Sequence, residues 1–157
     1  SLEDLMSILF IYPALVIKDT ALEQLFRTGR YAPLRLEEAI RWCKEALITF
    51  RNAGIPVIRA GLQSTGELES PGTILAGPYH PAFRQMVESA LLLDAMLQAL
   101  GTAAPGASVV FRVNPRDIST AVGQNRCNIT ALKLQFGLNN VSFLTDRLVR
   151  RGAVMCA

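Results

Sequence analysis

The segment ILFIYPALVIK, residues 8–18, decides the fold class of this chain. It is an almost continuous apolar run rich in isoleucine, valine and leucine, which is typical of a strand buried on both faces of a helix-covered parallel sheet. Pro13 lies inside the run and favours an edge position or a strand end, because proline cannot donate a ladder hydrogen bond. We therefore predict an extended segment that packs against further strands.

The residues that follow predict helices and then a second strand. Residues 21–28 read as a helix that ends at Gly29, a residue suited to a helix C-terminus. The next predicted helix begins at Leu36, ends near Asn52 and has one apolar stripe at helical spacing. Residues 56–62 then read as a short strand. The order strand, helix, helix, strand indicates a layered α/β unit.

Residues 63–80 have the glycine, proline, serine and threonine density of a long loop. Such a loop is typically functional or a domain junction. We place a domain boundary here and predict domains over residues 1–75 and 76–157. Pro81 opens a helix that runs to about Leu100 and is apolar nearly all round, so it is expected to be buried on more than one side.

The last third of the chain alternates short strands and helices. Predicted strands cover residues 108–113, 141–144 and 153–156, and predicted helices cover residues 117–122 and 127–136. A glycine turn at Gly123 separates the two helices. This pattern indicates a small α+β domain.

Composition excludes several classes of protein. Half of the 157 residues are hydrophobic and 18% are charged, which indicates a globular chain. The longest apolar runs are about half of the roughly 20 residues that a membrane-spanning helix needs, so we expect no membrane segment. Cys43, Cys127 and Cys156 are an odd number with wide spacing, which favours free thiols in a reducing, cytoplasmic setting. We predict no metal site.

Charge is distributed unevenly along the chain. Residues 1–105 contain nine Lys/Arg and eleven Asp/Glu, a balance of −2. Residues 106–157 contain seven Lys/Arg and two Asp/Glu, a balance of +5. A basic third indicates a polyanionic partner, and a solvated surface face is the alternative.

Five polar residues near the predicted strand ends are candidates for ligand binding, because ligands of layered α/β folds usually bind at strand ends. They are Tyr12, Lys18, Arg59, Gln63 and His80. Tyr12 and Lys18 are an even number of residues apart, so one continuous strand would place them on the same side. Each has a structural alternative: Lys18 as a solvated side chain, Arg59 as the partner of a carboxylate, and His80 as a helix cap or a packed ring.

The turn between the two predicted C-terminal helices is the strongest candidate for nucleic-acid binding. It combines backbone N–H groups with the positive end of the second helix. The candidate RNA-binding residues are Arg116, Gly123, Gln124, Asn125, Arg126 and Lys133. An ordinary helix–turn–helix packing corner is the alternative.

Residues 12–31, YPALVIKDTALEQLFRTGRY, resemble a segment of radical-SAM proteins of the elongator-catalytic-subunit and oxygen-independent coproporphyrinogen III oxidase type. Residues 54–63, GIPVIRAGLQ, and 76–83, AGPYHPAF, resemble later blocks of the same family. Asp19 stands where the family pattern has glycine. The resemblance implies the end of a partial (β/α) barrel, whose cluster-binding cysteine motif would lie outside this chain. A four-iron cluster and S-adenosylmethionine would belong to the parent enzyme, with the five polar candidates near substrate or S-adenosylmethionine.

Residues 113–137 separately resemble a KH-type RNA-binding unit, in which a G-x-x-G turn links two helices. Here the turn Gly123-Gln124-Asn125-Arg126 keeps the first glycine only. The resemblance implies contact between this turn and an RNA backbone.

Together these features predict an α/β to α+β chain: terminal strand–helix units of a radical-SAM barrel followed by a small KH-like domain. We expect a C-terminal fragment of an iron–sulfur enzyme, catalytically incomplete by itself, whose partner is the missing N-terminal half of the barrel. RNA and a tetrapyrrole precursor remain open as substrates. An RNA- or tRNA-binding module and a structural or oligomerisation domain are the alternative functions.

Overall fold

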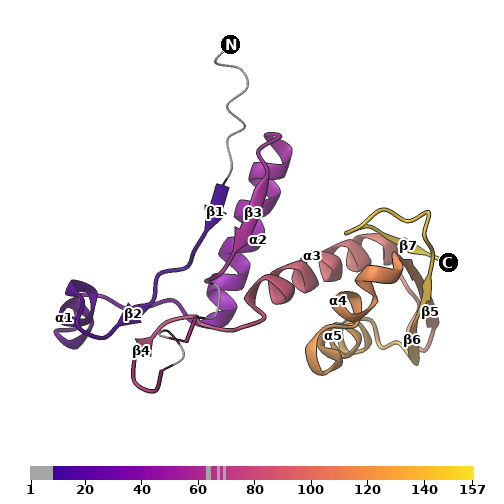
Figure 1. Ribbon diagram of the computed structural model, residues 1–157. Coiled ribbons are helices and arrows are strands. Elements are labelled where there is room, and N and C mark those ends of the chain that lie inside the picture. The colour runs from indigo at the N-terminus through magenta and orange to yellow at the C-terminus, as the bar shows by residue number, and fades with distance from the viewer. Residues whose placement is uncertain (1–8, 63–64, 67, 69) are drawn as a thin grey trace, which may run out of the picture. The chain divides into compact units, whose positions relative to one another are not determined.

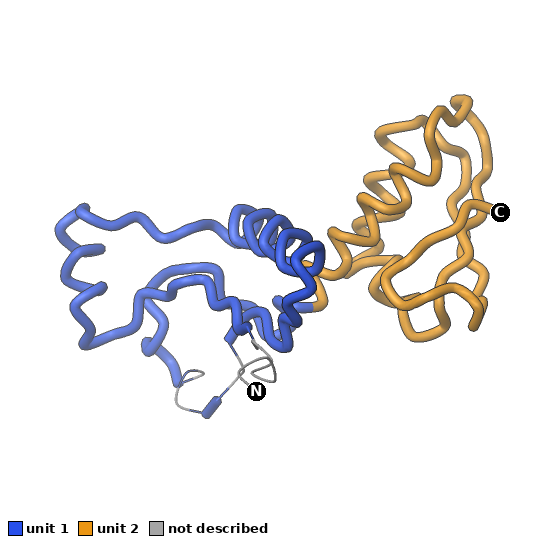
Figure 2. The backbone as a smooth tube through the Cα atoms, turned by 90° about the horizontal axis from the view of Figure 1, so that it is seen from above, with its two compact units in different colours: residues 1–84 blue, residues 85–157 orange. Residues whose placement is uncertain are grey.

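The computed structural model describes residues 9–62, 65–66, 68 and 70–157. Within this part, the fold is α+β, with five α-helices and small sheets (Figure 1). The chain divides into two compact units, residues 1–84 and 85–157 (Figure 2). The division falls near the start of helix α3. The domain boundary that we place at residues 75/76 stays a prediction, because a division by contacts does not test independent folding.

The apolar run at the start of the chain forms two short strands, so the prediction of one continuous strand is wrong. Strand β1 (Leu9–Ile11) pairs in parallel with β3 (Val57–Ala60), and β2 (Val16–Ile17) pairs antiparallel with β4 (Ile74–Ala76). Pro13 lies between β1 and β2, where its missing N–H would interrupt any ladder. The two halves of the run therefore join different sheets.

Burial in the same run also differs from the prediction. Leu15 and Val16 are buried, as an all-apolar strand requires. Phe10 and Tyr12, however, are 48% and 44% exposed. The two rings stack on the same side of the chain, with Phe10 in β1 and Tyr12 directly after it. The expectation of burial on both faces is therefore wrong for β1 in this chain.

Two helices connect β2 to β3 in unit 1. Helix α1 (Ala21–Arg27) begins after Thr20, whose Oγ1 accepts a hydrogen bond from the N–H of Glu23 at 3.3 Å. Helix α2 (Leu36–Asn52) buries one stripe of its surface, namely Ala39, Cys43 and Leu47. The periodicity of the sequence predicts this amphipathic helix correctly, because the apolar positions recur every three or four residues.

Strand β4 lies within the segment that the sequence analysis assigns to a loop. Its pairing with β2 brings Gly77 against the backbone of residues 14 and 15: a Cβ on Gly77 would lie 3.1 Å from Ala14 O and 3.2 Å from Leu15 Cα. With φ at 116°, this position suits glycine alone. The long loop is therefore part of the packing of unit 1.

Unit 2 contains one three-stranded sheet and three helices. Its strands are β5 (Ser108–Val113), β6 (Asn140–Thr145) and β7 (Val154–Cys156), in the order β6-β5-β7. The pair β5 and β6 is parallel, and the pair β5 and β7 is antiparallel. The helices are α3 (Phe83–Leu100), α4 (Ile118–Val122) and α5 (Cys127–Phe136), with 3₁₀ turns η2 (Pro115–Asp117) and η3 (Gln124–Arg126). These elements follow the sequence prediction closely.

A contiguous apolar core fills unit 2. It joins α3, strands β5 and β6, and α5, and Phe111 and Leu132 within it have no exposed surface. Its buried members are Met96, Val109, Phe111, Ile129, Leu132, Leu138 and Val141. The nearly all-apolar surface of α3 follows from this packing, because α3 also supplies Leu92 to a second cluster with Val113 and Ala121.

Candidate functional site

The carboxyl ends of the parallel strands β1 and β3 carry an aromatic and cationic surface. Phe10 is paired with Arg59 in the strand register, and the guanidinium carbon of Arg59 lies 6.0 Å from the centre of the Phe10 ring. The ring of Tyr12 stacks beside Phe10 with centroids 6.0 Å apart. We call Phe10, Tyr12 and Arg59 the aromatic face. Two of the five predicted ligand-binding residues, Tyr12 and Arg59, come together here.

Arg59 lies in β3, within the strand predicted over residues 56–62, and is exposed. Among the described residues it forms no ion pair, and its guanidinium lies over the Phe10 ring. Phe10 is the member of the aromatic face that the sequence analysis does not select. The sequence spacing could have indicated Phe10, because residues two apart in an extended segment lie on the same side and Phe10 precedes Tyr12 by two.

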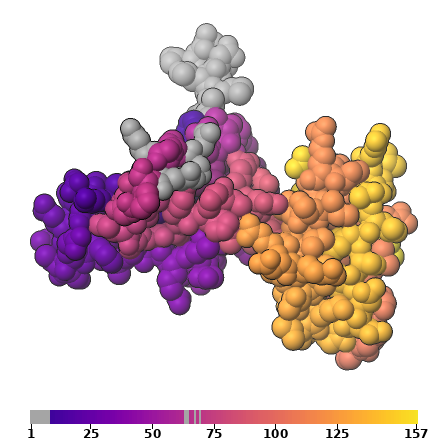
Figure 3. All heavy atoms as spheres, turned by 60° about the horizontal axis from the view of Figure 1, so that its bottom comes forward, coloured from indigo at the N-terminus to yellow at the C-terminus, as the bar shows by residue number. Residues whose placement is uncertain are grey.

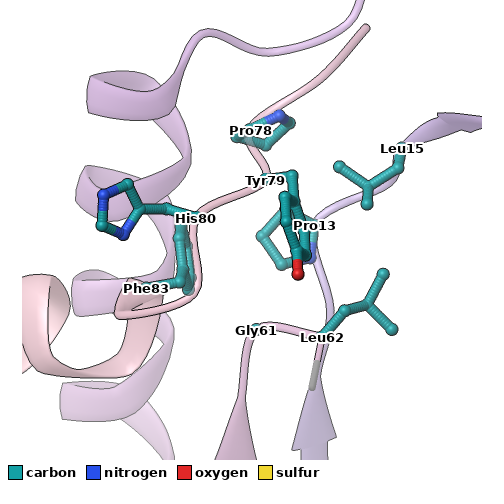
Figure 4. A pocket seen from close by; sticks show the side chains of 8 residues that line it. All are labelled: Pro13, Leu15, Gly61, Leu62, Pro78, Tyr79, His80 and Phe83. Carbon is teal, nitrogen blue, oxygen red and sulfur yellow. The ribbon is translucent and has the colours of Figure 1, made fainter. Parts of the chain in front are cut away.

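A small pocket lies beyond the carboxyl ends of these strands (Figure 4). Its volume is about 10 Å³, the space of a single water molecule. The lining residues are Pro13, Leu15, Gly61, Leu62, Pro78, Tyr79, His80 and Phe83. Gly61 approaches Phe83 so closely that a Cβ would lie 2.7 Å from the ring. The pocket is a packing feature rather than a substrate cavity.

His80 acts as the cap of the following helix. Its Nδ1 accepts a hydrogen bond from the N–H of Ala82 at 3.0 Å, and its carbonyl accepts one from the N–H of Phe83 at 3.0 Å. Figure 4 shows the ring extending away from Leu15 and Leu62. These contacts agree with the alternative of His80 as a helix cap. The Nδ1 atom of its imidazole is occupied by the hydrogen bond from the N–H of Ala82.

Lys18 and Gln63 do not join the aromatic face in the described structure. Lys18 follows β2, and its backbone N–H donates to the carbonyl of Thr73 at 2.9 Å. The expectation that Lys18 shares a strand face with Tyr12 is wrong, because the strand ends between them. Gln63 lies outside the described residues.

An apolar groove of about 220 Å³ lies between β1 and α2. Its lining residues are Ile11, Tyr12, Pro13, Leu34, Ala39, Trp42, Cys43 and Ala46. Trp42, the one tryptophan in the chain, is 60% exposed. Burial raises the pKa of the Cys43 thiol, so this group is neutral at physiological pH. The groove is lined mainly by apolar side chains.

The three cysteines do not fit an iron–sulfur cluster within the described part of the chain. Cys43 is buried in α2, whereas Cys127 and Cys156 are exposed in α5 and β7. No three His, Cys, Asp or Glu residues of the described ranges gather as metal ligands. We therefore assign no cluster ligand to these residues.

The turn between α4 and α5 is the most unusual backbone of unit 2. Gly123, Asn125 and Arg126 all have positive φ, at 77°, 50° and 61°. Left-handed conformations are costly for residues other than glycine, least so for asparagine. Gln124, Asn125 and Arg126 are exposed. The turn thus presents three polar side chains and the start of α5 to solvent.

A buried asparagine holds this turn in place. Asn128 is 3% exposed, and its Nδ2 donates to the carbonyls of Ser89 and Ala121 at 3.0 Å each. Gly123 must be glycine, since a Cβ would lie 2.5 Å from the sulfur of Cys127. The sequence analysis does not select Asn128, and no pattern signals it, because its partners are distant in sequence.

The remaining candidates for RNA binding lie at different ends of the helices. Arg116 is exposed at η2, which precedes α4, and Lys133 is half-buried in the second half of α5. The structure therefore brings Gly123, Gln124, Asn125 and Arg126 together in the turn and leaves Arg116 and Lys133 outside it.

With the parallel pair β1 and β3 covered by an intervening helix, unit 1 has the local architecture of a β/α unit. A family model described as the Radical_SAM C-terminal domain matches residues 7–92, more than half of the chain. The chain therefore belongs to the radical-SAM C-terminal domain family. No curated protein and no solved structure matches it. Among the helices of the described residues, none is both long and apolar enough to cross a membrane.

Proposed function

We propose that this chain is the RNA-holding C-terminal part of a radical-SAM enzyme that acts on RNA. Unit 2 binds the RNA backbone, and the aromatic face of unit 1 borders the reaction chamber. The observation that carries the RNA assignment is the exposed turn Gly123–Arg126, which is braced from behind by Asn128.

The turn has the chemistry that a phosphate backbone requires. Arg126 supplies a cation whose planar fork suits phosphate oxygens. The first N–H groups of α5 have no partner within the helix and favour anions. The balance of +5 over residues 106–157 attracts a polyanion at long range. This combination supports a KH-like contact with RNA and favours RNA over a tetrapyrrole.

The aromatic face supports a place for unit 1 in the wall of a barrel. In a β/α barrel, helices cover the outer face of the strands, and active sites lie at the carboxyl ends of the strands. Phe10 and Arg59 are exposed near such an end, and Tyr12 beside them borders the groove along α2. Their exposed rings would then meet other strands of the same enzyme, substrate or S-adenosylmethionine.

The side chains of the aromatic face suit S-adenosylmethionine and include no ligand for an iron–sulfur cluster. Phe10 and Tyr12 offer ring surfaces for an adenine, and Arg59 offers a cation for a carboxylate. When bound next to a four-iron cluster, S-adenosylmethionine supplies a 5′-deoxyadenosyl radical in this family. We propose that the cluster ligands lie elsewhere in the enzyme.

Binding of a fluorescent tRNA transcript to the 157-residue chain tests the RNA assignment. The variant Gln124→Asp/Asn125→Asp adds two negative charges to exposed positions, and Asp tolerates the backbone of residue 125 nearly as well as Asn. We expect anisotropy titrations at low salt to show at least a tenfold loss of affinity.

The matched control is Gln135→Glu/Asn139→Asp, which adds the same charge at exposed positions beyond the turn. It should bind tRNA several-fold more tightly than the turn variant. Absence of binding by the unmodified chain at low salt, where phosphate contacts are strongest, would reject the RNA assignment. Equal losses in both variants would reject the turn as the contact.

A titration of the isotopically labelled chain with S-adenosylmethionine tests the aromatic face. We expect amide shifts at Phe10, Tyr12 and Arg59 that are lost in Arg59→Gln. Shifts confined to unit 2, or unchanged by Arg59→Gln, would contradict the assignment.

A further inference from the structure

The turn between β6 and β7 is the most arginine-rich segment of the chain. Residues 147–151 read Arg-Leu-Val-Arg-Arg, and we call them the arginine turn. The C-terminal end of the chain, which contains this segment, is yellow in Figure 3 and lies at the surface of unit 2. The match to the radical-SAM C-terminal domain ends at residue 92 and does not include this segment.

Buried contacts fix the backbone of the arginine turn from inside. Val149 is 4% exposed, and its carbonyl accepts a hydrogen bond from Asn114 Nδ2 at 2.9 Å. The N–H of Leu148 donates to Asp146 Oδ1 at 2.8 Å, which closes the entry of the turn. The conformation is therefore set by the rest of unit 2 rather than by the arginines.

A buried carboxylate holds the other end. Asp117 is 3% exposed, and its Oδ2 accepts a hydrogen bond from the N–H of Gly152 at 2.8 Å. Its Oδ1 pairs with Nε of Arg151 at 2.5 Å. The side chain of Arg151 remains 57% exposed, so Nε is used for anchoring while the outer part of the guanidinium faces solvent.

The remaining side chains of the turn point outward. Arg147 and Arg150 are exposed and have no ion-pair partner among the described residues. Leu148, between them, is 91% exposed. A turn with an anchored backbone and outward cations loses little entropy on binding, because only side chains need to be ordered.

The arginine turn lies at the opposite end of α4 from the turn Gly123–Arg126. Asn114 and Asp117, its anchors, immediately precede α4, and Gly123 follows it. Helix α4 has five residues, which corresponds to about 8 Å at 1.5 Å per residue. Exposed Arg116 lies on the arginine-turn side. Cations thus flank both ends of one short helix.

We propose that the arginine turn is a second phosphate-binding surface, which extends the contact with single-stranded RNA along α4. The proposal rests on RNA being the ligand of unit 2 but uses residues independent of the turn Gly123–Arg126. Arg147 and Arg150 contact successive phosphates through their guanidinium groups. Leu148 covers apolar parts of the sugar or base between them.

An RNA strand fits the arginine turn better than a membrane surface does. One exposed leucine contributes only about 1.5–3 kcal/mol of apolar burial, and stable membrane attachment of a protein takes more than one such signal. A phosphate backbone, in contrast, needs only outward cations with fixed spacing, which the anchors Asn114 and Asp117 provide.

The test compares the full chain with Arg147→Gln/Arg150→Gln across a salt series, using the same tRNA transcript and a single-stranded oligonucleotide. For a single strand, each lost phosphate contact reduces the salt slope by about 0.7. We expect a slope shallower by about 1.4 and an affinity about 25-fold lower at 0.1 M salt. Both arginines are exposed, so thermal stability should not change.

The matched control Arg51→Gln/Arg112→Gln removes two exposed arginines elsewhere and should keep the original slope. The variant Arg147→Lys/Arg150→Lys should recover most of it, because the charge remains. An equal loss in the control would show a general charge effect and overturn the proposal. The proposal would also be overturned if Arg147→Lys/Arg150→Lys showed the same loss of salt slope as Arg147→Gln/Arg150→Gln.

Failure of this inference is distinguishable from failure of the proposed function. If Gln124→Asp/Asn125→Asp abolishes binding while Arg147→Gln/Arg150→Gln binds normally, RNA binding stands and the arginine turn is excluded. If the Gln pair loses only binding to vesicles of phosphatidylserine and phosphatidylcholine, the ligand is a membrane and the proposal falls.

Discussion

The two units of this protein differ in how their strands are assembled around buried apolar residues. Unit 2 surrounds a closed core, in which Phe111 and Leu132 are fully buried between a three-stranded sheet and its helices. Unit 1 has two separate strand pairs and leaves large side chains open to solvent. These side chains are Phe10, Tyr12, Leu34, Trp42, Ile48 and Ile58.

This difference indicates which unit is complete. A two-stranded sheet is marginal in water, and parallel sheets are normally covered on both faces. Unit 2 has a closed core, so its backbone is fixed from within and can present exposed turns. Unit 1 supplies an uncovered sheet face, which supports our proposal that it packs against the remainder of a barrel.

Core truncation gives the largest expected effect and tests the comparison directly. Leu132→Ala removes a side chain with no exposed surface and should lower the free energy of unfolding of unit 2 by about 3–5 kcal/mol. Leu134→Ala, on the same helix but 81% exposed, should change it by less than about 0.5 kcal/mol. Calorimetry with hydrogen exchange assigns each transition to its unit.

The corresponding pair in unit 1 is Leu47, 1% exposed, and Ile48, 41% exposed. We expect Leu47→Ala to cost about 2–3 kcal/mol, less than Leu132→Ala, because the short two-stranded pairs of unit 1 can relax around the cavity. Equal costs in the two units would contradict the view that unit 1 has the less complete core.

A backbone substitution near β2 gives a smaller effect of opposite sign. Asp19 has φ of 62°, a left-handed conformation that favours glycine. Asp19→Gly should stabilise unit 1 by about 0.5–1 kcal/mol, and Asp19→Ala should destabilise it. Melting curves of the two variants give the comparison, and destabilisation by glycine would exclude backbone strain as the cause.

The smallest effect concerns acid sensitivity of α1. The hydrogen bond from Arg27 to Glu23 at 2.7 Å, with a second from the N–H of Asp19, lowers the pKa of the Glu23 carboxyl below its ordinary value. A lowered folded-state pKa means that the stabilisation is present above about pH 4.3 and is lost as pH falls through the folded value.

Carbon-13 NMR titration of the Glu23 carboxyl gives its pKa directly. Arg27→Gln should move that pKa upward, toward the ordinary value for glutamate. An unchanged pKa in this variant would show that the ion pair is not its main cause.

Local patterns determined most elements of this protein. The 3.6-residue periodicity of apolar residues predicted α2. Apolar runs bounded by glycines predicted β5, α5 and β6, because these signals lie within each element and its immediate neighbours. The first apolar run was harder. Its composition signals a strand, but Pro13 and the pairing partners β3 and β4 decide where that strand breaks.

The sequence by itself therefore determined the order of helices and strands, the basic C-terminal third and the family of residues 7–92. Only the tertiary structure decided that Phe10 and Arg59 share an open face, that Asn128 braces the Gly123 turn, and that Asp117 anchors the arginine turn. The physical reason is distance along the chain: Asn128 bonds to residue 89 and Asp117 to residues 151 and 152. Periodicity reports local burial, whereas buried polar contacts between distant segments depend on the complete fold.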